Sequence, residues 1–312
     1  MRTKNYLLII KIDPYNHFKL NLFMIVKLRD SLFAELVLEG DGIYSGMNKN
    51  ISGQSLEKAM REKVADRNYH DYLETISENH SIPVMDHEVK NFISNLPKYS
   101  IILDIGGCWG WHWRNLEAIR PDINVVIIDF VRANLIHAKN VLGDFVGRKI
   151  WLVHADAKDL PFKINKTFKG FNAVWTVQTF QHIPDFEAVM NESFRVLCDE
   201  GYFANYSLHN TPFNRFVYYC LNKNFHKKGE VKGSYYLERA NQDQLNIISN
   251  IFGKQNILER FTENLFHPDL KLKFTGKENS RLAILDIFIS RFSFFAKLIA
   301  RQRGTLAKKV IN

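Results

Sequence analysis

Cysteine is scarce in this 312-residue chain, which has only three. Cys108, Cys198 and Cys220 are widely scattered. Such spacing forms neither a disulfide framework nor a metal-binding pattern. Few cysteines without a framework favour a reducing compartment, so we expect the protein to be cytoplasmic.

Long hydrophobic runs are also missing. The most apolar stretch near the N-terminus, 6–10, is too short to cross a membrane, and the charged residues Lys11 and Asp13 come directly after it. It is short for the core of a signal peptide, and no small-residue cleavage site is evident. The sequence therefore predicts neither a transmembrane helix nor a secretory signal.

Two nucleotide-binding signatures are absent. No Walker-type phosphate-binding loop occurs in the chain. The dinucleotide signature needs glycines at its first, third and sixth positions. Counted from Gly106, the third and sixth positions hold Cys108 and Trp111. The sequence therefore argues against a nicotinamide cofactor.

Positive charge is in excess, with a formal net charge of +9, and 46% of the residues are hydrophobic. That hydrophobic fraction is typical of a globular protein, and the length suits one large domain or one domain with additions. The charge permits contact with nucleic acid, an anionic membrane or an acidic substrate, but it selects none of them.

The stretch from Ile101 to Gly110 organises the chain. Aliphatic residues at 101–105 predict a short buried strand with Asp104 near its end, and a glycine-rich turn follows. Trp111 can then start a helix that runs to Ile119. Strand, tight turn and helix open many nucleotide-binding α/β domains, although an ordinary glycine turn would give the same pattern.

Further strands follow at regular spacing, at 125–129, 151–157, 171–175 and 202–206, with a helix at 185–197 before the last of them. Alternating strands and helices predict a parallel sheet with right-handed crossovers. The strands at 125–129 and 151–157 carry Asp129 and Asp156 at or near their ends.

In order and spacing, these motifs between Ile101 and Tyr206 resemble the class I S-adenosylmethionine (SAM)-dependent methyltransferases. The resemblance is to the small-molecule branch that includes quinone-biosynthesis enzymes, known as methyltransferase type 11. It implies a Rossmann-like, doubly wound, mostly parallel seven-stranded α/β sheet, with SAM as the cofactor. A helical N-terminal extension and a helical C-terminal addition would complete this fold.

We expect two parts of the chain. Residues 1–98 form the helical extension, and residues 99–312 form the SAM-binding domain. That domain carries an aromatic and basic insertion at about 209–236. An amphipathic helix spans about 281–303, ended by Gly304, and a short edge strand follows at 305–311.

The resemblance assigns the nucleoside end of SAM to two strand ends. Asp129 would accept hydrogen bonds from both ribose hydroxyls, because a carboxylate can accept from two donors at once. Phe130 would flank the adenine. Asp156 would receive the adenine amino group, and Ala157 would offer its backbone N–H to the ring.

The methionine end is assigned to the glycine-rich turn. Gly106, Gly107 and Gly110 would let the backbone pass beneath it, and Asp104 would attract its ammonium directly or through water. The family usually has glycine where this chain has Cys108. A Cβ there crowds the loop or forces a different φ.

His182 is the candidate catalytic residue. It follows the fourth strand, where the ligand crevice of such a sheet lies, and imidazole suits proton transfer near neutral pH. The alternative is that His182 only braces its loop. Methyl transfer needs alignment of donor and acceptor, and a hydroxyl acceptor also needs a base.

We therefore predict methyl transfer to a small-molecule, glycan or lipid-linked acceptor, at a hydroxyl. The basic C-terminal helix either packs on the domain or lies on an anionic membrane surface. An RNA methyltransferase is suggested only by charge, so nucleic acid is not the expected partner. A SAM-binding subunit without catalysis is a third alternative, motivated by Cys108 and by Gln181, which stands where similar motifs have glutamate.

Overall fold

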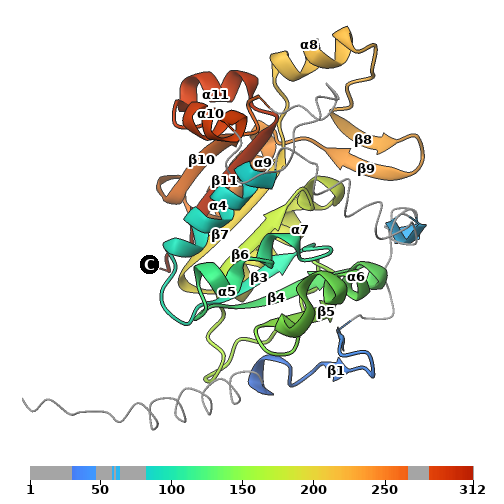
Figure 1. The fold of residues 1–312 in the computed structure, drawn as a ribbon, viewed down its shortest axis with the longest axis vertical. Coiled ribbons are helices and arrows are strands. Elements are labelled where there is room, and N and C mark those ends of the chain that lie inside the picture. The colour runs from blue at the N-terminus through green and yellow to red at the C-terminus, as the bar shows by residue number, and fades with distance from the viewer. Residues whose placement is uncertain (1–29, 47–57, 60, 64–81, 266–280, 312) are drawn as a thin grey trace, which may run out of the picture.

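The structure is a computed structural model that describes residues 30–46, 58–59, 61–63, 82–265 and 281–311. Within them, one nine-stranded sheet runs through the molecule (Figure 1). Its strands, in spatial order, are β1 (Val37–Leu38), β2 (Tyr44–Ser45), β5 (Ile150–His154), β4 (Asn124–Asp129), β3 (Ile101–Ile105), β6 (Phe171–Val177), β7 (Leu197–Leu208), β11 (Gln302–Lys308) and β10 (Ile257–Thr262).

In the spatial order β2-β5-β4-β3-β6-β7, each strand is parallel to the next. Strand β11 is antiparallel to both β7 and β10. The strands from β5 to β10 make up the seven-stranded, mostly parallel sheet expected from the sequence. The short β1–β2 hairpin widens the β5 edge. Residues 37–45 are therefore not helical, although the sequence predicts a helical extension there.

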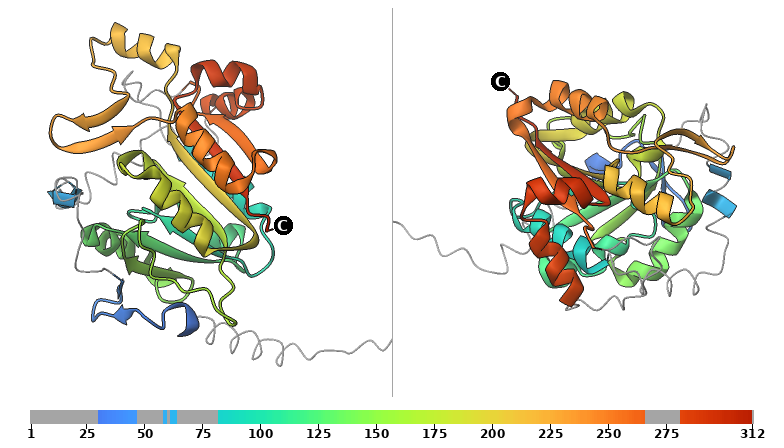
Figure 2. Two further views of the ribbon diagram at one scale, coloured as in Figure 1. Left: turned by 180° about the vertical axis from the view of Figure 1, so that it is seen from behind. Right: turned by 90° about the horizontal axis from the view of Figure 1, so that it is seen from above.

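Helices cover both faces of the sheet, which explains why its central strands are apolar without alternation. On one face lie α4 (Ile82–Ser94), α5 (Leu116–Ile119) and α6 (Arg132–Leu142) (Figure 1). On the other lie α7 (Phe186–Val196) and α9 (Gln242–Phe252) (Figure 2). Along β3, Leu103 belongs to the core beneath α7 and α9, whereas Ile102 belongs to the core beneath α4 and α6.

The insertion after β7 consists of α8 (Pro212–Cys220) and a hairpin of β8 (Lys228–Val231) and β9 (Tyr235–Glu238). Helix α8 packs against the C-terminal part of the chain, since Asn214 Nδ2 donates to the carbonyl oxygen of Ala300 at 3.0 Å. The hairpin lies at the same end of the molecule as the carboxyl ends of the parallel strands (Figure 1).

The C-terminal part differs from the sequence prediction in two ways. The single helix expected over 281–303 is two helices, α10 (Arg281–Ile289) and α11 (Ser293–Ile299). The strand expected at the edge begins earlier, at Gln302, and lies between β7 and β10. Gly304 is inside this strand, where a Cβ would come within 2.5 Å of the Tyr206 ring. Its role is therefore close packing and not helix termination.

A buried polar cluster joins α4 to the sheet. Glu88 of α4 is 4% exposed and accepts hydrogen bonds from the Tyr206 hydroxyl at 2.7 Å and from Arg260 Nε at 3.0 Å. Tyr206 belongs to β7 and Arg260 to β10, so one carboxylate connects three elements far apart in the chain.

No helix among the described residues is both long and apolar enough to cross a membrane. The helices expected before residue 82 lie largely outside the described residues.

Candidate cofactor site

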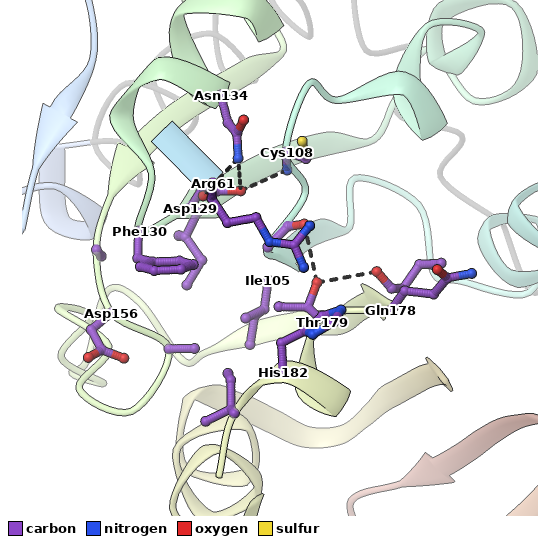
Figure 3. A pocket seen from close by; sticks show the side chains of 16 residues that line it. Arg61, Ile105, Cys108, Asp129, Phe130, Asn134, Asp156, Gln178, Thr179 and His182 are labelled. Carbon is purple, nitrogen blue, oxygen red and sulfur yellow. Dashed lines mark hydrogen bonds between the residues drawn. The ribbon is translucent and has the colours of Figure 1, made fainter. Parts of the chain in front are cut away.

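A pocket opens at the carboxyl ends of β3, β4, β5 and β6, where ligands bind in open α/β sheets (Figure 3). Four loops from the sheet and one short helical stretch between β2 and β3 contribute to its wall. The lining residues are Arg61, Ile105, Gly106, Cys108, Ile128, Asp129, Phe130, Asn134, Ala155, Asp156, Ala157, Val177, Gln178, Thr179, His182 and Ile183.

The loop after β3 requires glycine where the sequence analysis places the methionine end of SAM. Gly106 has φ 69°, and a Cβ there would come within 2.2 Å of the Thr179 side chain. Cys108 has φ 51°, a left-handed conformation that most residues avoid. The loop therefore accommodates Cys108 by adopting the glycine-like backbone and not by changing φ.

Asp129, at the end of β4, forms the centre of the pocket. It is 5% exposed and accepts hydrogen bonds from the backbone N–H groups of Val131 at 2.8 Å and Cys108 at 3.1 Å. Burial raises the pKa of its carboxyl to about 6, against the opposing effect of these N–H groups. A carboxylate has about four acceptor positions, and these two N–H groups share them with the longer contacts of Asn134 Nδ2, at 3.4 Å from both oxygens.

Asp104, Gly107 and Gly110 do not line the pocket, although the sequence analysis places them in the cofactor site. Asp104 is 1% exposed and accepts a hydrogen bond from Trp113 Nε1 at 2.6 Å. Burial raises the pKa of its carboxyl to about 7. A Cβ on Gly107 would come within 2.2 Å of Asp104 Oδ2, so this glycine makes room for the buried carboxyl. The role of Asp104 in holding the ammonium of SAM stays a prediction.

Phe130, Asp156 and Ala157, which the resemblance assigns to the adenine, all line the pocket. Asp156 Oδ1 accepts a hydrogen bond from the backbone N–H of Lys158 at 2.9 Å, which fixes the loop after β5. The contacts of these three residues with adenine stay predictions.

His182 also lines the pocket, and both of its ring nitrogens make hydrogen bonds. Its Nδ1 lies 2.8 Å from the carbonyl oxygen of Tyr236, so Nδ1 carries the proton and donates. Its Nε2 then accepts from Gln181 Nε2 at 3.1 Å. Burial, followed by the charge of Arg61, lowers the pKa of the ring to about 4. His182 is therefore neutral at physiological pH and connects the pocket to β9.

Sequence reasoning missed four polar lining residues: Arg61, Asn134, Gln178 and Thr179. Asn134 lies one turn into α6, where its amide contacts both Asp129 oxygens at 3.4 Å. A polar residue so soon after a strand-end acid is a usable sequence signal. Arg61 lies far before β3 in the sequence and gives no such signal.

The fold and the position of this pocket agree with those of a class I SAM-dependent methyltransferase domain. In agreement, residues 103–205 match the model of the family Methyltransf_11, described as a methyltransferase domain. This stretch contains the strands β4, β5 and β6 that carry most of the pocket. No curated protein sequence matches the chain.

Two solved structures with this fold cover most of the chain. One is a SAM-dependent methyltransferase from Thermotoga maritima, a possible histamine N-methyltransferase. It is 14% identical, with 81% of this chain and 99% of that chain covered and a TM-score of 0.53. The other comes from the complex between the Haloferax volcanii Trm112 methyltransferase activator and the methyltransferase assigned to it. It is 13% identical, with coverages of 82% and 98% and a TM-score of 0.51. At these identities the likeness concerns the fold alone.

Replacing Asp129 tests the cofactor site. Asp129→Ala is expected to weaken SAM binding by about 1–3 kcal/mol in calorimetry, because two ribose hydroxyls lose a charged acceptor. Since burial raises the Asp129 pKa to about 6, wild-type affinity should also fall as the pH drops through that value. Asp129→Asn should remove this pH dependence.

The matched control is Asp122→Ala, which removes an acid that bonds Arg120 and the Tyr99 N–H outside the pocket. It should leave SAM affinity unchanged. An Asp129→Ala protein that binds SAM normally would remove Asp129 from the site.

Proposed function

We propose that the protein transfers the methyl group of SAM to a hydroxyl of a small-molecule, glycan or lipid-linked acceptor. The observation that carries this proposal is the pocket itself, in which the two strand-end acids Asp129 and Asp156 face the same space as His182 (Figure 3). The two acids can accept hydrogen bonds from the nucleoside of SAM. His182 follows β6 and bonds the carbonyl oxygen of Tyr236 in the insertion.

The chemistry asked of the protein is modest. Methyl transfer is an in-line displacement from a sulfonium carbon with a neutral leaving group, so alignment supplies much of the rate. A hydroxyl acceptor additionally loses a proton, and a neutral imidazole can accept it. We assign this step to His182 Nε2, which would exchange its bond from Gln181 for one from the acceptor hydroxyl.

The activity test has two stages. Native mass spectrometry with added SAM should show one bound cofactor. Incubation with cell extract and a labelled methyl donor should then place label in a small-molecule or lipid fraction. Label in RNA, with binding that weakens steeply with salt, would support the RNA methyltransferase instead. Bound SAM without any labelled product would support a non-catalytic subunit.

We further propose that the protein contacts an anionic membrane surface through α8, α10 and α11. Large apolar side chains stand exposed on these helices and the turn joining α10 to α11, among them Phe216, Phe288, Phe292 and Phe294, the last 85% exposed. Phe288, Phe292 and Phe295, which the alternative would pack on the domain, are each at least half exposed, and this supports the membrane proposal.

The positive charge of these helices favours an anionic bilayer as the partner of this surface. The helices α8, α10 and α11 contain one acidic residue, Asp286, and it is fully buried. Arg215, Arg291 and Lys297 are exposed among the aromatic residues. Exposed aromatic and basic side chains on adjacent helices suit the interface of an anionic membrane. Helices α8 and α11 contact each other and lie at one end of the molecule (Figure 2).

Vesicle sedimentation tests the membrane surface. The protein should sediment with vesicles containing phosphatidylglycerol and much less with pure phosphatidylcholine. Phe292→Ser with Phe294→Ser should reduce binding about tenfold or more, because each inserted ring contributes burial of apolar area. Arg291→Gln with Lys297→Gln should cost about 1 kcal/mol per charge.

The control is Ile164→Ser, an exposed apolar residue outside this surface. It should leave sedimentation unchanged. The wild type could instead sediment with neither kind of vesicle, while the aromatic variants change the oligomeric state. This result would mean that the surface joins two copies of the chain and does not bind a membrane.

A further inference from the structure

Arg61 is the cation of the cofactor pocket. Among the described lining residues it is the only side chain with a full positive charge, because the low pKa of His182 keeps that ring neutral. It belongs to a short helical stretch between β2 and β3, and its guanidinium reaches across the pocket between Asp129 and Thr179 (Figure 3). A guanidinium stays charged at every physiological pH.

The methionine end of SAM contains a carboxylate, and a buried carboxylate needs charged or hydrogen-bonding partners. The loop after β3 is the usual source of N–H groups in a turn of this kind. Here those groups are already used. Gly106 and Gly107 donate to the carbonyl oxygen of Ile128, at 2.8 and 3.3 Å. Cys108 donates to Asp129.

The N–H of Gly110 is also used, since it donates to the carbonyl oxygen of Gly107 at 2.8 Å. The Asp129 carboxylate, which accepts a hydrogen bond from this loop, would repel a second carboxylate there. The loop therefore fits the ammonium of the cofactor better than its carboxylate.

We propose that Arg61 binds the carboxylate of the methionine end of SAM. This inference rests on the assignment of the pocket to SAM. A guanidinium offers two parallel N–H donors that match a carboxylate.

Decarboxylated SAM isolates this contact, because it has the sulfonium, ammonium and nucleoside but no carboxylate. Calorimetry should be performed with both cofactors on the wild-type protein and on Arg61→Gln. We expect Arg61→Gln to weaken SAM binding about 10- to 100-fold, the range of a hydrogen bond to a charged group. Its affinity for decarboxylated SAM should stay within about twofold of wild type. Arg61→Lys should recover part of the loss.

Lys63→Gln is the matched control, since Lys63 belongs to the same stretch but does not line the pocket. It should bind both cofactors as the wild type does. Equal losses for SAM and decarboxylated SAM in Arg61→Gln, or no loss for either, would overturn the proposal. Unchanged cofactor affinity with a raised KM for the acceptor would assign Arg61 to an anionic acceptor instead. A wild-type protein that binds neither cofactor would overturn the assignment of the pocket itself.

Discussion

His182→Ala is expected to lower kcat by about 10²–10⁴-fold on a hydroxyl acceptor, the usual contribution of a positioned base. SAM affinity should change little, because the proposed cofactor contacts come from other residues. The low pKa of the wild-type ring, about 4, sets the pH dependence. The neutral imidazole, which can accept a proton, persists as the pH falls through neutrality. Wild-type kcat should therefore decline only near pH 4 and not near the ordinary histidine pKa of about 6.5.

The variant His182→Gln distinguishes a catalytic base from a residue that only holds its loop in place. A glutamine amide can still donate to the carbonyl oxygen of Tyr236, as Nδ1 does, but it cannot accept a proton from the acceptor. The base role predicts that both variants lose kcat to a similar extent. Recovery of kcat by His182→Gln, or normal turnover by His182→Ala on the true substrate, would leave His182 only the role of holding β9 at the pocket.

Glu88→Ala is expected to lower the free energy of unfolding by about 2–4 kcal/mol. Breaking a buried ion pair leaves its partners uncompensated. The Tyr206 hydroxyl would lose its acceptor at 1% exposure, while Arg260, with a 32% exposed side chain, would regain some water. This access to water places the expected loss at the lower part of the range for buried pairs.

Urea unfolding of Glu88→Ala and of a control measures this loss. Glu117→Ala removes the exposed partner of Arg148, so it should change stability by less than about 1 kcal/mol. A loss below about 1 kcal/mol for Glu88→Ala would show that the cluster contributes little to stability. SAM affinity should be unaffected, since Glu88 does not line the pocket.

The central sheet was predictable because its strands have local signatures. Parallel strands are buried on both faces, so β3, β4 and β5 read as aliphatic runs, and glycine or aspartate marks their ends. Local patterns of this kind need no knowledge of the neighbours. The helix α7 was equally predictable from its apolar spacing and from Asp185, whose side chain caps it.

The C-terminal part could not be predicted in the same way. Phe288, Phe292 and Phe295 repeat at helical spacing, but the chain turns after Ile289 and the helix divides. The place of β11 depends on its contact with β7, about a hundred residues away, and no local pattern encodes it.

The candidate site divides along similar lines. Asp129, Phe130 and Asp156 follow strands and were predictable as pocket residues. Asp104 has the same signature, but the Trp113 indole holds it inside the core. Whether a strand-end aspartate faces the pocket or the core therefore depends on its hydrogen-bond partners in the folded protein. Arg61 reaches the pocket only through tertiary structure.

The position of β11 also governs the order in which the molecule can be completed. On a ribosome, β10 is synthesised about forty residues before β11, but its place in the sheet is next to β11 and not next to β7. The edge of β7 that pairs with β11 must stay unpaired until residues 302–308 have been synthesised. Long-range pairing of this kind is slow, and an open edge meanwhile invites pairing with other chains. Strand β11 thus connects β10 to β7. A chain cut short before Gln302 could not hold β10 in the sheet, and it would lose the Arg260–Glu88 contact as well.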